Sequence, residues 1–238
     1  MNIRSDLPLL RGSVAIALAG AMALPAEAAL AEDGDMRRNQ TAPTLALDVV
    51  APKLKVGDLV FIRIAFKPFL EVATATNTWT NHVGVVVDVS GDEPRIGESA
   101  FPLSRITTLS RFVRRSENGR FAVTRLNDDL TAEQQVEVLA AATRRSGILY
   151  DTGFDLHSRR EFCSRYAREV LAEASGRVVG EVETFAHLLA SRPDVNQTFW
   201  KVWYFGRIPW NRETVTPASL LRSQEVRTVF DGAAKVSQ

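Results

Sequence analysis

Apolar and polar positions follow patterns along this chain that predict strands in its first half and mainly helices later. Residues 59–64 form a short apolar, β-branched run, which is typical of a buried strand. In residues 81–89 a valine occupies every second position, which predicts a strand with valines on one face and His82 on the other. The turn residues 90–94 then return the chain into a strand at 95–100, antiparallel to the histidine strand.

Helical spacing becomes prominent from residue 131 onward. Thr131 supplies cap chemistry for a helix that runs to Gly147. Because strands and helices are mixed without βαβ alternation, the sequence predicts an α+β fold with an antiparallel sheet packed against helices. The other expected elements are an irregular loop over 65–80, a short basic helix or turn over 102–115, a strand over 119–126, a helix over 182–191, an aromatic strand over 198–205 and a partly irregular tail from residue 209.

The only cysteine, Cys163, lies in another amphipathic pattern, with apolar residues at spacings of three and four as far as Leu171. Ser158 and Glu161 have the spacing of a capping box, so this helix is expected to begin near Ser158. Cys163 then lies in the first turns, where unpaired amides and the helix dipole favour a thiolate. Such a thiolate is the nucleophile of cysteine hydrolases, whereas the alternative is a small buried hydrophobe.

Three histidines are available as the base that a catalytic cysteine needs. His187 lies off the apolar face of its predicted helix, and His157 lies in a loop shortly before Cys163. His82 stands at the start of a strand, on the face where Gly84 leaves space. A histidine at a strand end that faces a helix N-terminus is the arrangement required for Cys–His catalysis.

Glu98 is the candidate for the third group, which would orient the histidine. If the turn between the two strands pairs even-numbered residues with even, Glu98 and His82 emerge on the same face. A solvated carboxylate is the alternative for Glu98, and Asp88, Asp151 and Asp155 remain substitutes. The sequence shows no His, Asp, Glu or Cys cluster with metal-ligand spacing, so we expect neither a metal nor a cofactor.

Residues 1–31 predict a signal peptide. Two arginines precede the apolar run 12–24, which is shorter than the roughly 20 residues that span a bilayer. Small residues around Ala28 and Ala31 then offer sites for a signal peptidase, while an uncleaved anchor is the alternative. We therefore expect a periplasmic or secreted protein, without stable membrane insertion after signal cleavage.

Residues 32–50 are polar and read as a linker, and 51–238 form one domain with a sizeable core. Removal of 1–31 leaves the net charge at +1, because two arginines, one aspartate and one glutamate are lost together. This balance gives no reason to expect a nucleic acid or an anionic membrane as partner. A single cysteine also excludes an internal disulfide, so the domain must be stable through its core alone.

The order of these pieces resembles the permuted branch of the papain-like, NlpC-type cysteine hydrolases, the YiiX/YebB-like group, in which the histidine strand precedes the cysteine helix. The resemblance implies a circularly permuted papain-like fold, with Cys163 as nucleophile, His82 as base and Glu98 as orienting residue. Arg165 and Asn81 depart from the pattern of the group, which leaves the substrate preference open. The matching pieces are residues 57–61, 81–85, 97–100, 147–151 and 162–164.

The resemblance implies a cysteine hydrolase that cleaves an amide bond through a thioester, and the predicted signal peptide implies that it is exported. Its substrates would be peptides or cell-wall peptides, and a lipid-ester hydrolase or acyltransferase acting on an acyl substrate at the same site is the alternative. A papain-like binding module without turnover is the rival from another class. Aromatic residues between 199 and 210 would line a groove for sugar or acyl groups, or would simply pack in the core.

Overall fold

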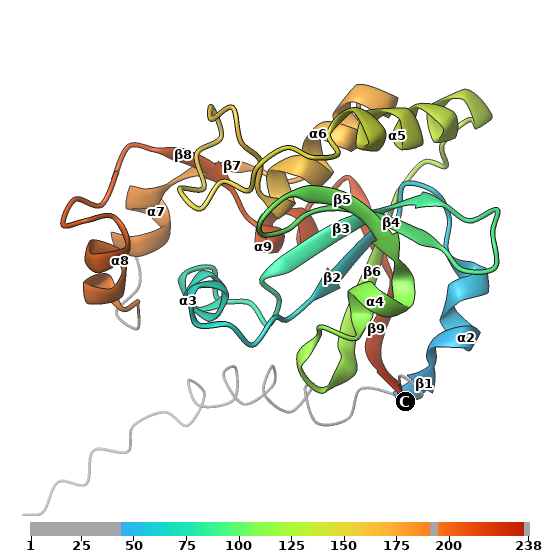
Figure 1. Ribbon diagram of the computed structural model, residues 1–238, viewed down its shortest axis with the longest axis horizontal. Helices are drawn as coiled ribbons and strands as arrows, with labels where there is room; N and C mark the ends of the chain where they lie inside the picture. The colour runs from blue at the N-terminus through green and yellow to red at the C-terminus, as the bar shows by residue number, and fades with distance from the viewer. Residues whose placement is uncertain (1–43, 191–194, 236–238) are drawn as a thin grey trace, which may run out of the picture. The chain divides into compact units, whose positions relative to one another are not determined.

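The computed structural model describes residues 44–190 and 195–235 (Figure 1). Within this part of the chain the main sheet has seven strands in the order β1-β9-β6-β2-β3-β4-β5, and only β1 and β9 pair in parallel. The predicted α+β class with an antiparallel sheet is therefore confirmed. The strands are β1 (Thr44–Ala46), β2 (Leu59–Ile62), β3 (His82–Asp88), β4 (Arg95–Ser99), β5 (Ser104–Thr108), β6 (Arg120–Leu126) and β9 (Val226–Lys235), and a separate pair is formed by β7 (Val182–Thr184) and β8 (Glu213–Val215).

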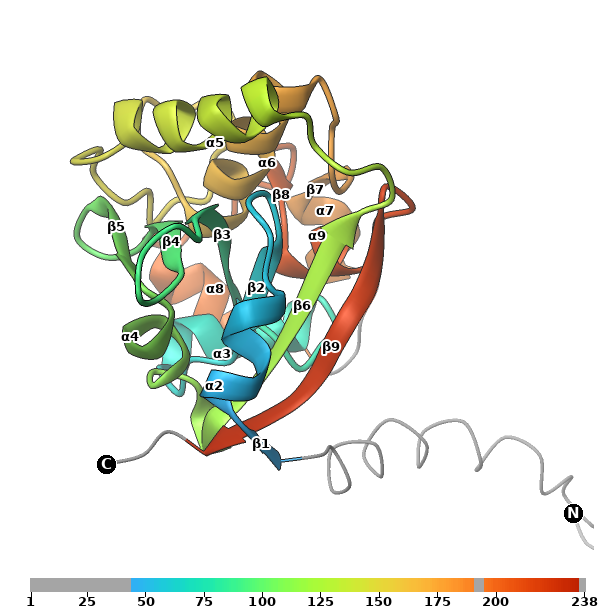
Figure 2. The ribbon, with the colours of Figure 1, turned by 90° about the vertical axis from the view of Figure 1, so that its right-hand side faces the viewer.

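Helices cover both faces of this sheet, with α5 and α6 over one face and α2 and α4 over the other (Figure 2). Alternate residues of one strand enter different cores: Phe61 and Val85 pack toward α6, whereas Ile62 and Val86 pack toward α4. A sheet buried on both faces explains why residues 59–62 form a continuous apolar run. The helical elements are α2 (Leu47–Val50), η1 (Ala51–Lys53), α3 (Lys67–Ala75), α4 (Leu109–Val113), η2 (Glu117–Gly119), α5 (Ala132–Arg144), α6 (Cys163–Ser175), α7 (Phe185–Ala190), α8 (Gln197–Trp203) and α9 (Pro217–Leu221).

The pairing of β3 with β4 has the parity on which the choice of Glu98 depends. Val86 lies opposite Ile96, so even-numbered residues pair with even, and a β-bulge precedes Asp88. His82 and Glu98 consequently project from the same face of neighbouring strands. The expected strand over 119–126 and the Thr131-capped helix are also present, as β6 and α5.

The helix expected from Ser158 begins later, so that prediction is wrong. Glu161 is held extended instead, because its amide donates to Leu149 and its carbonyl accepts from Asp151. This pairing keeps the chain extended through Phe162, which is the N-cap residue of α6 and makes no side-chain cap. The first residue of the helix is Cys163 itself.

The strand expected at 198–205 is also wrong, because α8 occupies this segment. Asn196 accepts a hydrogen bond from the amide of Phe199 at 2.9 Å and so caps the helix. Trp200 and Trp203 are then three residues apart, which is a helical spacing that an aromatic strand pattern hides.

Other segments are more regular than their sequence patterns indicate. The expected loop over 65–80 contains α3, and 102–115 divides into β5 and α4. The expected helix over 182–191 starts as β7, and the tail contains β8, α9 and β9. β1 and α2 lie within 32–50, while the predicted signal peptide lies outside the described residues. Among the helices of residues 44–190 and 195–235, none has the length and apolar character needed to cross a membrane.

Candidate active site

Cys163 is the first residue of α6 and is almost completely buried where this helix meets the sheet. The helix is held there by its apolar face, since Tyr166 and Val170 pack in the same core as Val83 of β3. Burial raises the pKa of the thiol, but the charge and hydrogen bonding of His82 outweigh it, with smaller help from the amides of Val83 and Ser164. The net effect lowers the pKa of Cys163, which favours the reactive thiolate.

His82 is completely buried at the start of β3, and the structure fixes the orientation of its ring. Nε2 lies 2.7 Å from Oε2 of Glu98, which leaves Nδ1 as the nitrogen available to Cys163. The ring stacks on Phe112 of α4 with centroids 5.5 Å apart, and Phe69 of α3 lies at 6.3 Å. Gly84 makes this packing feasible, because a Cβ there would stand 2.8 Å from Phe112.

The imidazole and the thiol interact as a coupled pair. Burial lowers the pKa of His82, but Cys163 and Glu98 raise it more strongly by charge and hydrogen bonding, so the net shift is upward. No aligned hydrogen bond to Nδ1 forms among the described residues. Such bonds commonly tighten only when substrate binds. The opposite shifts of the two pKa values favour an imidazolium–thiolate ion pair.

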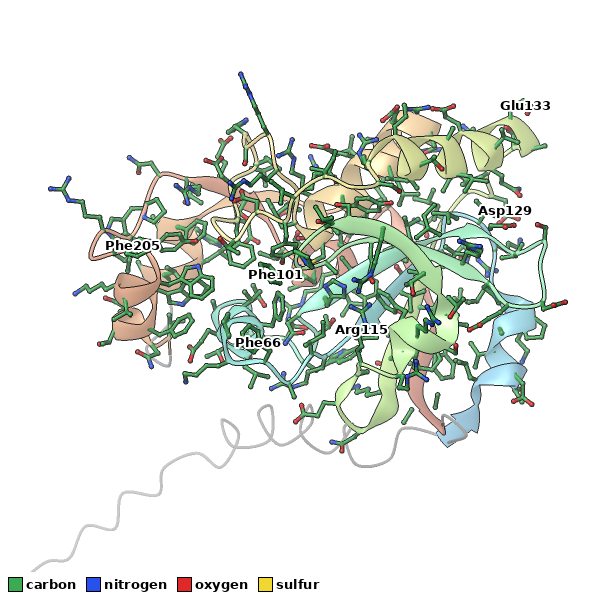
Figure 3. The ribbon with its side chains drawn as sticks, viewed as in Figure 1. Phe66, Phe101, Arg115, Asp129, Glu133 and Phe205 are labelled. Atoms are coloured by element: carbon green, nitrogen blue, oxygen red, sulfur yellow. The ribbon has the colours of Figure 1, made fainter. Side chains whose placement is uncertain are left out.

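Glu98 is completely buried and receives hydrogen bonds from two arginines as well as from His82. Nη2 of Arg115 donates to Oε2 at 2.6 Å, and Nε of Arg105 donates to Oε1 at 3.1 Å. Burial raises the pKa of Glu98, but His82 and Arg115 outweigh it and lower the pKa to about 2. The carboxylate therefore stays ionised. Arg115, labelled in Figure 3, also lies over the Phe112 ring at 5.0 Å.

Tyr150 is a further residue at this site, and the sequence reasoning assigned no role to it. Its side chain is buried beside Cys163, and burial together with the neighbouring thiolate raises its pKa well above its ordinary value. The hydroxyl therefore stays protonated and has no hydrogen-bond partner among the described residues. A protonated donor next to a cysteine thiolate can bind an oxyanion that develops there. Its position in the stretch 147–151, which carries the resemblance, was the only available signal.

The other candidate residues are engaged in interactions of their own. His157 is exposed and pairs with Glu213 at 2.8 Å, and His187 is exposed on α7. Asp151 accepts from the amides of Gly153 and Asp155 and so stabilises a loop. Asp155 and Asp88 likewise accept hydrogen bonds from nearby backbone amides.

The two departures from the family pattern have structural partners. Arg165 donates to the carbonyls of Ser158 and Arg160 and forms an ion pair with Glu169 at 2.7 Å, so it fastens the loop before Cys163. Asn81 accepts from the amide of Ile64 and donates to its carbonyl, which extends the pairing at the end of β2. Both residues thus hold segments next to the site.

An apolar pocket opens at the thiol of Cys163. Side chains from α3, α7 and α8 contribute to its wall, and its polar lining residues besides Cys163 are Asn81, Tyr150, Ser164 and three threonines. The pocket joins the cysteine to the cluster that packs around Phe185 and Trp200. The apolar lining residues are Phe69, Val72, Ala75, Phe154, Phe162, Phe185, Leu188, Leu189, Trp200, Val215 and Pro217.

A cysteine at the start of a helix that packs against an antiparallel sheet with a histidine at a strand end defines the papain-like class of cysteine hydrolases. Here the histidine strand precedes the cysteine helix, so the order is permuted. Residues 53–230 match the family of permuted papain-like amidase enzymes, YaeF/YiiX, and the chain belongs to this family. The predicted permuted papain-like fold and cysteine-hydrolase class are thereby confirmed.

Two similar proteins support this assignment. The uncharacterized protein YiiX of Escherichia coli K12 is 28% identical over 175 residues, which cover 74% of this chain and 85% of that protein. The crystal structure of the metalloprotein yiiX from Escherichia coli O157:H7 superimposes with a TM-score of 0.70 at 26% identity, covering 75% of this chain and 98% of the other. In residues 44–190 and 195–235 of this chain, no three His, Cys, Asp or Glu side chains form a group that could hold a metal ion.

Proposed function

We propose that Cys163 is the nucleophile, that His82 is its base through Nδ1, and that Glu98 orients the imidazole. The 2.7 Å contact between Nε2 and Glu98 supports this assignment, because it points the other nitrogen toward the thiol. The lowered pKa of Cys163 and the raised pKa of His82 support the ion-pair form. A thiolate with an imidazolium beside it can attack a carbonyl at neutral pH.

The thiolate of Cys163 attacks the carbonyl carbon of an amide, which forms a C–S bond and places negative charge on the oxygen. The free amide of Cys163 at the helix start and the hydroxyl of Tyr150 donate to this oxyanion. The imidazolium of His82 gives its proton to the leaving nitrogen as the C–N bond breaks. Water then attacks the thioester, His82 accepts the proton from water, and the acid leaves as the thiolate is restored.

The acyl part of the substrate is apolar in this proposal, and the apolar pocket at Cys163 is the observation that carries it. Leu188, Phe185 and Trp200 give the pocket a wall without charged side chains, so a carboxylate of a cell-wall peptide would lose its hydration there without compensation. The apolar character of this wall favours an amide with a hydrophobic acyl residue over one with a charged residue. The same pocket would take the acyl part of a lipid ester, so ester hydrolysis or acyl transfer is the second candidate.

Hydrolysis of aminocoumarin amides that share one leaving group tests this preference. We expect kcat/KM for leucyl or octanoyl amides to exceed that for the γ-glutamyl amide at least about tenfold, because burying an alkyl side chain contributes about 1.5–3 kcal/mol. Cys163→Ala should abolish turnover of all of them, and Leu188→Ala should favour longer acyl chains. A preference of the wild-type protein for the glutamyl amide would contradict the proposal.

We also propose that the enzyme is exported to the periplasm or beyond the cell. The predicted signal peptide at residues 1–31 supports this location. A single cysteine, used as a nucleophile rather than in a disulfide, is compatible with an oxidising compartment.

A further inference from the structure

Residues 197–212, which we call the aromatic tip, have an unusual composition. They comprise α8 and the loop to β8, and six of the sixteen residues are aromatic. Three are basic and none is acidic. The net charge of +1 for the whole chain conceals this local excess of positive charge. The aromatic tip can therefore attract an anionic partner that the net charge alone does not indicate.

The aromatic tip has an inner side that anchors it and an outer side that faces solvent. Trp200 and Ile208 are buried and pack with Phe185 of α7. On the outer side, Val202 is 73% exposed and Phe205 is 98% exposed. Figure 3 labels Phe205 at the outer end of this segment. One set of apolar residues thus anchors the aromatic tip to the domain, and a second set of apolar residues faces solvent.

Phe205 also has an unfavourable backbone conformation. Its φ is +51°, in the left-handed region, where a residue other than glycine costs about 1–2 kcal/mol. Its side chain buries almost nothing in return, so neither the conformation nor the exposure stabilises the domain. A strained residue that displays an aromatic ring indicates a binding role outside the fold.

The charges beside these apolar groups select the kind of partner. Lys201 and Arg207 are exposed next to Val202 and Phe205, and neither forms an ion pair with another described residue. Arg212 is different, because it pairs with Asp155 at 3.6 Å. Exposed apolar side chains flanked by unpaired cations complement the surface of an anionic bilayer, where aromatic rings settle at the headgroups and each cation contributes about 1 kcal/mol.

We propose that the aromatic tip docks reversibly on the surface of an anionic phospholipid bilayer. Val202 and Phe205 enter the headgroup region, and Lys201 and Arg207 contact the lipid phosphates. Such shallow contact is compatible with the expectation that the protein does not insert stably into a membrane after signal cleavage. Because Trp200 also lines the pocket at Cys163, docking would bring that pocket near the lipid. The docking itself goes beyond the proposed function and does not depend on catalysis.

Tryptophan fluorescence of the full chain tests this docking directly. Three of the four tryptophans lie in the aromatic tip and none lies in residues 1–31, so quenching by brominated lipids reports tip contact even if the N-terminus also binds. We expect vesicles of phosphatidylglycerol and brominated phosphatidylcholine in equal parts to quench the wild-type protein, and high salt to reverse the quenching. Brominated phosphatidylcholine alone should quench far less.

Val202 on α8 and Val136 on α5 are both exposed, so a substitution at Val136 is a control for the substitution at Val202. The double variant Val202→Ser, Phe205→Ser should need at least about tenfold more lipid for half-maximal quenching. Val136→Ser should behave as wild type, since Val136 is 71% exposed on α5. The proposal is overturned if anionic vesicles fail to quench, if the double variant titrates like the wild type, or if neutral vesicles quench equally well. Tip-dependent self-association without vesicle binding would overturn it too.

Discussion

Replacement of Glu98 by glutamine perturbs the proposed active site with little change of volume. The carboxylate oxygen Oε2 accepts from His82 at 2.7 Å and from Arg115 at 2.6 Å, within a fully buried site. Glutamine removes the negative charge and exchanges one oxygen for an NH2 group, which cannot accept. At least one charge-assisted hydrogen bond is therefore lost, and such a bond contributes about 1.5–3 kcal/mol.

This loss acts on the ion pair between His82 and Cys163. Glu98 stabilises the imidazolium, so without it the thiolate loses part of the charge that lowers the pKa of Cys163. Because one pKa unit corresponds to 1.36 kcal/mol, the pKa of Cys163 should rise by about 1–2 units in this variant. Alkylation of the Glu98→Gln variant by iodoacetamide should then be slower at pH 6, by up to about 10–100-fold. The rates should converge near pH 9.

Cys163 is the only thiol, so the rate of alkylation reports on this site alone. Glu213→Gln is the matched control, because it removes the carboxylate from the exposed His157–Glu213 pair, whose contact is 2.8 Å. We expect its pH profile to equal that of the wild type. The reasoning is refuted if folded Glu98→Gln shows the wild-type profile, or if the control shifts by the same amount.

Three further predictions concern the rest of the chain. Tyr150→Phe should lower kcat about tenfold or more while Cys163 is alkylated at the wild-type rate, because only the oxyanion loses a donor; an unchanged kcat would remove Tyr150 from the mechanism. Burial raises the pKa of Glu161 to about 7, so its ionisation costs stability as pH rises from its unfolded pKa near 4.5 through about 7. Glu161→Gln should accordingly melt higher than wild type at pH 8 and gain much less at pH 5, whereas a variant less stable at pH 8 would contradict this sign. Intact mass of exported protein should show cleavage near Ala28 or Ala31, and a dominant species that retains the N-terminal methionine would indicate an anchor.

The local patterns predict the strands at the centre of the sheet, because a run buried on both faces has no polar alternation to misread. The shared face of His82 and Glu98 rests, in the sequence, on an assumed pairing of even-numbered residues with even. Asp88 lies opposite Arg95 at the turn, so it is the β-bulge before Asp88, which no local pattern indicates, that brings Val86 opposite Ile96. The sequence does not predict the arginines that donate to Glu98, because Arg105 comes from β5 and Arg115 from the chain after α4. Their approach depends on tertiary packing, which no local spacing records.

Two misread segments show how tertiary context overrides local pattern. Aromatic residues favour strands on average, but the Asn196 cap and burial of Trp200 make α8 a helix. The charged and glycine positions within β9 break any apolar alternation, yet the strand pairs with β6 from Val226 to Ala233, with one register shift at Val229. Its stability comes from that neighbour rather than from its own composition.

The most direct test of the central claim measures the reactivity of Cys163 in the folded protein at pH 6. The wild-type chain should form a covalent adduct with iodoacetamide rapidly, detected as a mass increase at the single cysteine. His82→Ala should react far more slowly at this pH, while His157→Ala should keep most of the wild-type rate. If Cys163 reacts only after denaturation, or if His82→Ala reacts as fast as wild type, the cysteine is structural and the proposed mechanism fails.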